Sequence, residues 1–259
     1  MPVLNESRNL PHVMSNLPKD CELVLVDGHS VDDTVEVAKA LRPDLVFVMQ
    51  NRTGKGNALA CGFEACSGDV IVMLDADGSN APAEIPRFVD ALVAGADFAK
   101  GSRFVDGGGS SDLTWLRSTG NRALSGIVNM VYRERFSDLC YGYMAFWRDV
   151  LPSFRLSAET PGGGRQWGDG FEIETLLNVR ASLASLNVVE VPSFEHARMY
   201  GVSNLRAASD GLRVLRTITR ERLVRPERSR RPSAGDLVEE PFPSTDGVHL
   251  DQAILLLED

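Results

Sequence analysis

The chain has 259 residues, 43% hydrophobic and 24% charged, which is enough apolar material for one large globular domain. Its formal net charge of -9 argues against a nucleic-acid partner, because proteins that bind DNA or RNA usually present a basic surface. The four cysteines form no C-x-x-C pair and match no zinc-site spacing, so we expect reduced thiols in a cytoplasmic protein. No apolar run approaches the roughly 20 residues that a membrane-spanning helix needs.

Short apolar runs alternate with helical patterns along the first part of the chain. The apolar runs are rich in β-branched residues and do not alternate with polar ones, which is typical of strands buried on both faces of a parallel sheet. This order of elements predicts a Rossmann-like α/β fold. The predicted strands are 22–26, 45–49 and 70–74, and the predicted helices are 30–41, 54–66 and one that begins at Pro82.

Aspartate directly follows two of the predicted strands, at Asp27 and at Asp75. Ligands of such sheets bind outside the carboxyl ends of the strands, so we expect both side chains at the ligand-binding edge. Asp75 and Asp77 form a D-x-D motif, in which each carboxylate disfavours ionisation of the other. They could cap the next helix, but Ser79 and Asn80 already supply caps. We therefore predict that Mg²⁺ or Mn²⁺ binds Asp77 and Asp75, because these cations prefer carboxylate oxygens together with substrate phosphates.

Eight short motifs occur in the order in which a known enzyme family has them. They are PVLNESRNL at Pro2, VDGHSVDDT at Val26, GKGNAL at Gly54, LDADGS at Leu74, GSRF at Gly101, SDLCYGYMAF at Ser137, GDGFEIETLL at Gly168 and VVEVPSFEHARMYGVSNL at Val188. On these motifs the chain resembles the family 2 glycosyltransferases, which are inverting enzymes of the GT-A fold. The branch with dolichol-phosphate mannose synthases and bacterial polyprenyl-phosphate sugar transferases is the most similar. The resemblance covers most of residues 2–224 and implies a mostly parallel sheet flanked by helices.

The resemblance also implies a donor site. In the family, the first motif lines the base and ribose pocket, the aspartate of the second contacts base or ribose, and the D-x-D holds ribose, metal and diphosphate. Arginine can place two N–H groups on phosphate oxygens, although any one arginine could equally be a solvated surface residue. The expected nucleotide-sugar-binding residues are Pro2, Asn5, Glu6, Asp27, Lys55, Asp75, Ala76, Arg103, Arg117, Arg198 and Ser203.

A second acidic motif, WGDGFEIETLL, is a candidate acceptor site. On a helix, Glu172 and Glu174 point about 200° apart, so only one of them can face a cleft. We predict that Asp77, Asp169 and Glu172 are catalytic, with one of the latter two as general base for an acceptor hydroxyl. A structural alternative makes Asp169 a helix cap and the glutamates a solvated face. A polyprenyl phosphate acceptor would need no base, because it is already ionised.

The two ends of the chain depart from the family pattern. Only Met1 precedes Pro2, so the first strand is expected to be truncated. Asn204 stands where many polyprenyl-phosphate enzymes have lysine, which weakens the lipid-phosphate assignment. A helix near the C-terminus combines an apolar stripe with a basic face, which suits either an anionic membrane surface or packing on the domain. We expect a GT-A domain over 1–224 and a disordered acidic tail over 225–259. The stripe is Leu205, Ala208, Leu212 and Leu215, and the basic face is Arg206, Arg213, Arg216 and Arg220.

Together these features predict a metal-dependent, inverting glycosyltransferase. It would move a sugar from a UDP- or GDP-sugar to a polyprenyl phosphate or a saccharide hydroxyl, in the cytoplasm or on the inner face of the membrane. Two alternatives are a sugar-nucleotide nucleotidyltransferase, which would normally carry a glycine-rich basic loop near its N-terminus, and a non-catalytic nucleotide-sugar binding protein. The sequence does not identify the sugar, the base of the donor or the oligomeric state.

Overall fold

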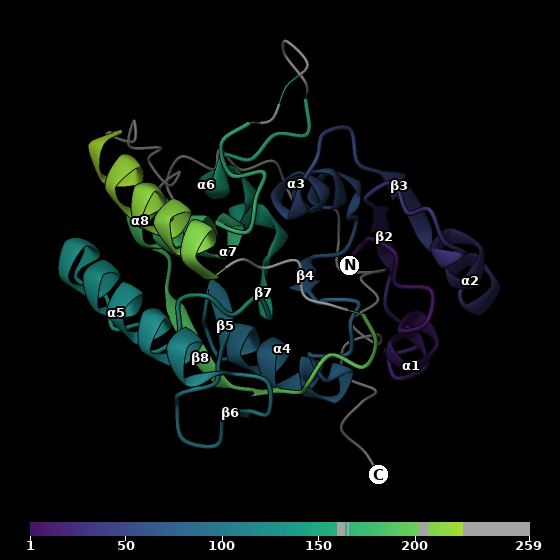
Figure 1. Cartoon of the computed structure of the whole chain (residues 1–259), viewed down its shortest axis with the longest axis horizontal. Helices are drawn as coiled ribbons and strands as arrows, with labels where there is room; N and C mark the ends of the chain where they lie inside the picture. The colour runs from purple at the N-terminus through teal and green to yellow at the C-terminus, as the bar shows by residue number, and fades with distance from the viewer. Residues whose placement is uncertain (160–163, 165, 202–206, 225–259) are drawn as a thin grey trace, which may run out of the picture. The chain divides into compact units, whose positions relative to one another are not determined.

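The computed structural model describes residues 1–159, 164, 166–201 and 207–224, the side chains of 207–210 excepted. All of them lie within one unit of the chain, Met1–Pro226. Strands and helices alternate along it, which confirms the predicted α/β class (Figure 1). The four cysteines form no disulfide, as expected for reduced thiols. The predicted tail over 225–259 lies outside the described residues, so the domain boundary at 224 stays a prediction.

The first sheet is parallel and has the order β1-β2-β3. Pro2 lies opposite Val26, and Asp27 lies opposite Met49. The backbone N–H of Val26 also donates to the carbonyl of Met1 (3.0 Å), so the expected truncated first strand is present as a short one. β3 is the edge of this sheet and is half-buried to exposed, unlike the prediction of burial on both faces. The strands are β1 Pro2–Val3, β2 Val24–Asp27 and β3 Val46–Met49.

A second sheet with the order β4-β7-β5-β8 carries the D-x-D motif at the end of β4. β7 runs antiparallel to both β4 and β5, whereas β8 is parallel to β5. β4 thus pairs with an antiparallel strand, whereas β1 with β2, β2 with β3 and β5 with β8 pair in parallel, as expected for a mostly parallel arrangement. Met73 pairs with Met144, so β7 begins at the edge where β4 ends. The strands are β4 Val70–Met73, β5 Phe98–Ser102, β7 Met144–Trp147 and β8 Val188–Pro192, and β6 Gly109–Ser110 pairs with β9 Phe194–Glu195.

Helices pack against these strands and against one another. α3 contacts β2 and β3, α4 contacts β5 and β7, and α5, α7 and α8 pack together. The core of the second sheet is aromatic, with Phe146 packed among Phe63, Phe98 and Phe154. The helices are α1 Leu10–Ser15, α2 Thr34–Leu41, α3 Lys55–Ala65, α4 Ile85–Val93, α5 Trp115–Tyr132, α6 Leu151–Phe154, α7 Ile173–Leu183 and α8 Ala207–Leu223, with short 3₁₀ turns at Pro82–Glu84 and Arg148–Val150.

The orientation of α8 differs from the predicted apolar stripe. Its buried residues are Val214, Thr217, Ile218 and Glu221, whereas Leu212 is 71% exposed. Leu215 is 36% exposed, and stripe residues 205 and 208, with Arg206 of the basic face, lie outside the described side chains. The side of α8 that faces the domain thus carries the apolar residues Val214 and Ile218 together with a buried carboxylate, not the predicted leucine stripe.

Glu221 attaches α8 to α7 through an ion pair. Its carboxylate accepts hydrogen bonds from Arg180 (3.0 and 3.1 Å), from Arg155 (3.0 Å) and from the indole of Trp167 (3.2 Å). Burial alone would raise the pKa of Glu221, but Arg180 and its other partners lower it below the ordinary value of 4.5. The ionised carboxylate therefore stabilises the folded state.

Glu221→Gln should lower the free energy of unfolding by about 3 kcal/mol at neutral pH, because it leaves Arg180 buried without its counter-charge. A carboxyl whose folded pKa is lowered stabilises the protein above its unfolded pKa and loses this effect as the pH falls through the folded value. The difference between wild type and variant, measured by denaturant unfolding, should therefore be complete at pH 7 and shrink below about pH 4.5. A difference that does not change with pH would contradict this account.

Candidate active site

The D-x-D loop after β4 is held in place by short-range hydrogen bonds. The backbone N–H of Asp75 donates to the side chain of Asn80 (3.0 Å), and Asp77 accepts from the backbone N–H (2.9 Å) and hydroxyl (2.6 Å) of Ser79. Ala76 is buried against the first sheet, and Gly78 turns with a positive φ of 82°. Hydrogen bonds between residues of the loop itself therefore fix the backbone that carries both carboxylates.

Asp75 belongs to a three-residue charge cluster, which we call the Lys55 cluster. The Nζ of Lys55 lies 2.7 Å from Asp75 and 2.8 Å from Glu174. Burial would lower the pKa of Lys55, but the two carboxylates raise it by more. Burial raises the pKa of Glu174, and Lys55 only partly offsets this. Lys55 comes from the first turn of α3 and Glu174 from the first turn of α7, so the cluster joins both helices to β4.

Asp77 belongs to a second cluster, which contains Glu6 and Arg198. The guanidinium of Arg198 lies 2.9 Å from Asp77 and 3.0 Å from Glu6. Backbone contacts bring Arg198 there, because the N–H of His196 donates to Ser79 (2.9 Å) and that of Met199 donates to Asp77 (3.2 Å). The two carboxylates of the D-x-D motif are therefore each paired with a different cation of the protein.

The end of β2 adds a third group of predicted residues. Asp27 is 1% exposed, and one of its oxygens accepts from the backbone N–H of Ser30 (2.9 Å). Its other oxygen is buried and has no hydrogen-bond partner among the described residues. Asn5 joins this loop, because its side chain accepts from Val31 (2.8 Å) and its N–H donates to Ser30 (2.9 Å). Pro2, Asn5, Glu6 and Asp27 thus gather at the ends of β1 and β2, and the unpartnered oxygen is free to accept from a ligand.

Two residues predicted to act in the site are instead held in buried ion pairs. Arg52 contacts Asp169 through two hydrogen bonds (both 2.9 Å), and Arg103 contacts Asp138 (2.7 Å) and Glu195 (3.0 Å). These contacts do not fit a general base at Asp169 or a diphosphate ligand at Arg103. Both partners lie far away in sequence, so no local pattern indicates them.

The remaining predicted residues lie in different surroundings. Glu172 is 6% exposed, with one oxygen accepting from Gly170 (3.3 Å) and the other unpartnered. Glu174, not Glu172, contacts the D-x-D motif through Lys55. Arg117 lies on α5, where it pairs with Asp112 (2.9 Å), and so does not join the carboxylate clusters. Ser203 lies outside the described residues.

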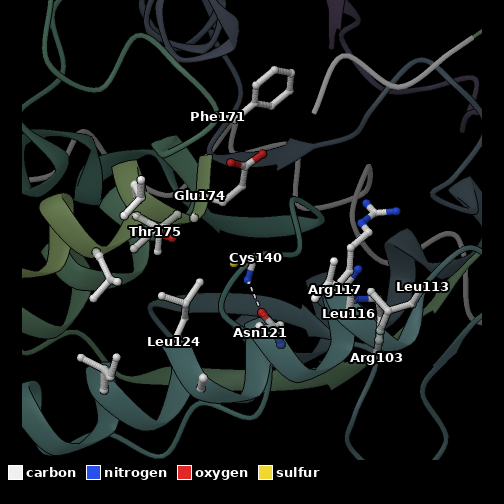
Figure 2. A pocket seen from close by; sticks show the side chains of 17 residues that line it. Arg103, Leu113, Leu116, Arg117, Asn121, Leu124, Cys140, Phe171, Glu174 and Thr175 are labelled. Carbon is white, nitrogen blue, oxygen red and sulfur yellow. Dashed lines mark hydrogen bonds between the residues drawn. The ribbon is translucent and has the colours of Figure 1, made fainter. Parts of the chain in front are cut away.

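An apolar pocket of about 500 Å³ lies between α5, α7 and α8, and Glu174 is among the residues that line it. Figure 2 shows Glu174 and Thr175 on the opposite side of the pocket from Asn121 and Leu124. The side chain of Asn121 accepts from the backbone of Leu139 (3.1 Å) and Cys140 (3.0 Å), but its NH₂ group has no partner in the part of the chain that the structure describes. Sequence reasoning missed this pocket, because it depends on how three helices meet. Its lining residues are Arg103, Leu113, Leu116, Arg117, Gly120, Asn121, Ala123, Leu124, Ile127, Cys140, Phe171, Glu174, Thr175, Gly211, Leu212, Val214 and Leu215.

Solved structures of other proteins have the same fold as this chain. Glucosyl-3-phosphoglycerate synthase from Mycobacterium tuberculosis, in complex with Mn²⁺, uridine diphosphate and phosphoglyceric acid, matches with a TM-score of 0.63 and 21% identity. The match covers 85% of this chain and 76% of that chain. A complex of the same synthase with uridine diphosphate gives a TM-score of 0.65, 21% identity and coverage of 85% and 78%. The fold is therefore that of the GT-A glycosyltransferases.

Sequence comparison identifies the family. The glycosyl transferase family 2 model matches residues 1–154. The polyprenol monophosphomannose synthase of Mycolicibacterium smegmatis is 33% identical over 220 residues, covering 81% of this chain and 80% of that protein. The dolichol-phosphate mannosyltransferase of Pyrococcus furiosus is 29% identical over 216 residues, but the match covers 58% of that protein and 80% of this chain. The chain belongs to glycosyl transferase family 2, which confirms the resemblance and the enzyme class.

Gly142, just before β7, offers a test of the Lys55 cluster. A Cβ at this position would lie 3.1 Å from the Nζ of Lys55 and 3.2 Å from Glu174. Gly142→Ala should therefore disturb both contacts and lower the free energy of unfolding by about 1–2 kcal/mol, measured by denaturant unfolding. Gly126→Ala on α5 is the matched control, because a Cβ there meets nothing within 4 Å. That control should stabilise by about 0.5–1 kcal/mol, and equal effects at the two sites would contradict the account.

Proposed function

We propose that the protein transfers a sugar from a nucleotide-sugar donor to the phosphate of a polyprenol-type lipid. The observation that carries this proposal is the apolar pocket, which Glu174 helps to line. Glu174 pairs with Lys55, and Lys55 pairs with Asp75 of the D-x-D motif. An isoprenoid chain needs such an apolar lining, whereas a saccharide acceptor would be better served by polar groups. Two relatives named for polyprenol and dolichol phosphate mannose support the same acceptor class.

The donor would bind at the ends of β1, β2 and β4. The unpartnered oxygen of Asp27 is suited to accept a hydrogen bond from the base or ribose of a UDP- or GDP-sugar. Asn5, Glu6 and Pro2 lie beside it. Arg198 has the planar fork of donors that suits a diphosphate, and Glu6 and Asp77 hold it at the D-x-D loop.

The carboxylates at the D-x-D loop fit a divalent cation that shares its ligands with the substrate. Among the described residues no cluster of three or more His, Cys, Asp or Glu side chains could hold a metal alone. Mg²⁺ commonly binds through one or two carboxylates and completes its shell with substrate phosphates. Asp77, with Asp75 beside it, would hold Mg²⁺ or Mn²⁺. When bound, the cation would neutralise charge on the departing diphosphate.

The acceptor phosphate would bind at the polar side of the pocket. The NH₂ group of Asn121 is buried and unpartnered, and Arg117 lies one helical turn before it. The ion pair of Arg117 with Asp112 is partly exposed, so it costs little to exchange Asp112 for a phosphate. The transfer would form a bond from a phosphate oxygen to the anomeric carbon and break the bond from that carbon to the diphosphate. The phosphate is already ionised, so no general base is required.

The location of the enzyme follows from the acceptor. Among the described helices none is long and apolar enough to cross a membrane. A polyprenyl phosphate is anchored in a bilayer, so the domain would work at the inner face of the membrane, with the nucleotide-sugar donor arriving from the cytoplasm. Family membership favours this transferase over the nucleotidyltransferase, and measurable transfer would exclude the non-catalytic binding protein.

Asp77→Asn should lower the rate of sugar transfer by about 10²–10³-fold, because it removes charge that holds the cation and Arg198. Transfer is measured from radiolabelled donor to a detergent-solubilised polyprenyl phosphate, with GDP-mannose assayed first and UDP-sugars next. Chelation of divalent cations should abolish wild-type transfer, and Mn²⁺ should restore it. Asp69→Asn is the control, because this carboxylate is 91% exposed. Full activity of the Asp77 variant would refute the metal assignment.

Asn121→Asp tests the acceptor side without changing the shape of the side chain. The two backbone N–H donors keep their acceptor, but the unpartnered NH₂ becomes a negative oxygen beside the incoming phosphate. The KM for the lipid phosphate should rise about tenfold or more, while the KM for the donor stays unchanged. Asn129→Asp, on the same helix but outside the pocket, is the control for lost stability. It should leave the KM for the lipid phosphate unchanged. An unchanged acceptor KM would contradict the proposed acceptor site.

A further inference from the structure

The outward face of α5 is unusually apolar for a surface helix. Trp115 is 80% exposed, Leu116 66% and Met130 77%. The exposed positions between them include Thr119, Gly120, Ala123 and Gly126, and the single charge on this face is Arg122. Surface helices normally place charged residues outward. A partner that removes these side chains from water would therefore be bound favourably.

α8 lies beside α5 and contacts it (Figure 1). The hydroxyl of Tyr132 on α5 donates to the carbonyl of Ile218 on α8 (2.6 Å), which links the two helices. Leu212 is 71% exposed and Leu223 is 81% exposed, and they lie eleven residues apart, about three turns, on one side of the helix. The buried residues of α8, including Glu221, lie on the other side. We call the exposed apolar residues of both helices the α5/α8 face.

The charge on this part of the chain is opposite to that of the whole protein. Residues 115–135 and 207–224 contain eight arginines and three acidic residues, whereas the chain as a whole has a net charge of -9. Of the three acids, Glu221 is buried in its ion pair. An apolar face bordered by arginines is complementary to a bilayer that contains anionic lipids, because the apolar side chains enter the headgroup region and the cations meet lipid phosphates.

The α5/α8 face is continuous with the apolar pocket. Leu116 and Ala123 of α5, and Leu212 and Leu215 of α8, line the pocket and are also exposed to solvent. The pocket therefore reaches solvent beside residues of the α5/α8 face, since Leu116 and Leu212 belong to both. A ligand with an apolar chain could pass from a bilayer into this opening without crossing water.

We propose that the α5/α8 face docks the domain on an anionic lipid bilayer, with the mouth of the pocket turned toward the membrane. The choice of a lipid acceptor rests on the proposed function, but the docking surface rests on exposed side chains and charge that need no acceptor. Docking would place Trp115, Met130 and Leu223 in the headgroup region. The D-x-D loop would remain on the aqueous side, where a nucleotide sugar can reach it.

The test is co-sedimentation of the full chain with vesicles, without donor or acceptor. Wild type should bind vesicles of phosphatidylcholine with about one third phosphatidylglycerol, and bind phosphatidylcholine alone at least about tenfold more weakly. Replacing Trp115, Met130 and Leu223 together by serine should reduce binding about tenfold or more, because none of the three would then enter the membrane. None of these residues lines the pocket, so transfer to a detergent-solubilised acceptor should stay unchanged.

The matched control replaces Val31 and Val93, which are 91% and 73% exposed on other elements, by serine. This variant should bind vesicles like wild type. Docking is refuted if wild type does not bind anionic vesicles, or if the triple variant binds as well as wild type. It is also refuted if the face joins two copies, so that wild type elutes as a dimer and the triple variant as a monomer. Vesicle binding without any sugar transfer would instead refute the proposed function and leave the docking surface intact.

Discussion

The site depends on the separate neutralisation of the two carboxylates in the D-x-D motif. Two unit charges this close repel strongly in a partly buried loop. Lys55 compensates Asp75, and Arg198 compensates Asp77. Because Lys55 also holds Glu174 and Arg198 also holds Glu6, this neutralisation joins four distant segments of the chain around one loop. The same contacts that make the loop tolerable electrostatically therefore assemble the surroundings in which a donor would bind.

The two sides of this loop differ in character. Toward β1 and β2 the surroundings are polar, with the unpartnered oxygen of Asp27. Toward α5 and α8 the surroundings are apolar, because residues of these helices line the apolar pocket together with Glu174. Such a division suits a reaction that joins a water-soluble donor to an acceptor with an apolar chain. Gly142, just before the antiparallel β7, lies close to the Lys55 cluster, because a Cβ at this position would be 3.1 Å from the Nζ of Lys55.

Several parts of the structure could be predicted because their cause is local. The positions of β2, β3 and β4 follow from short runs of β-branched residues, and the D-x-D loop follows from aspartates at a strand end. The unit formed by Asp27, Asn5 and the loop at Ser30 also involves residues close to predicted strand ends. The direction of β7 and the exposure of β3 were not predictable in this way, since pairing partners and sheet edges depend on the whole topology.

By itself, the sequence determined the α/β class, the enzyme family and the positions of Asp27, Asp75 and Asp77 at strand ends, although β2 and β4 lie in different sheets. Only the tertiary structure decided which charged residues lie at the candidate active site and which form ion pairs elsewhere. Asp169 is 117 residues from its partner Arg52, and Arg103 is 35 residues from Asp138. No local spacing could therefore indicate that these side chains form buried ion pairs. Glu174, in the first turn of α7, contacts Lys55, whereas Glu172 precedes the helix as its N-cap residue, and the packing of α5, α7 and α8 formed the pocket. Local patterns specify where a side chain leaves the backbone, but its partner is specified by three-dimensional packing.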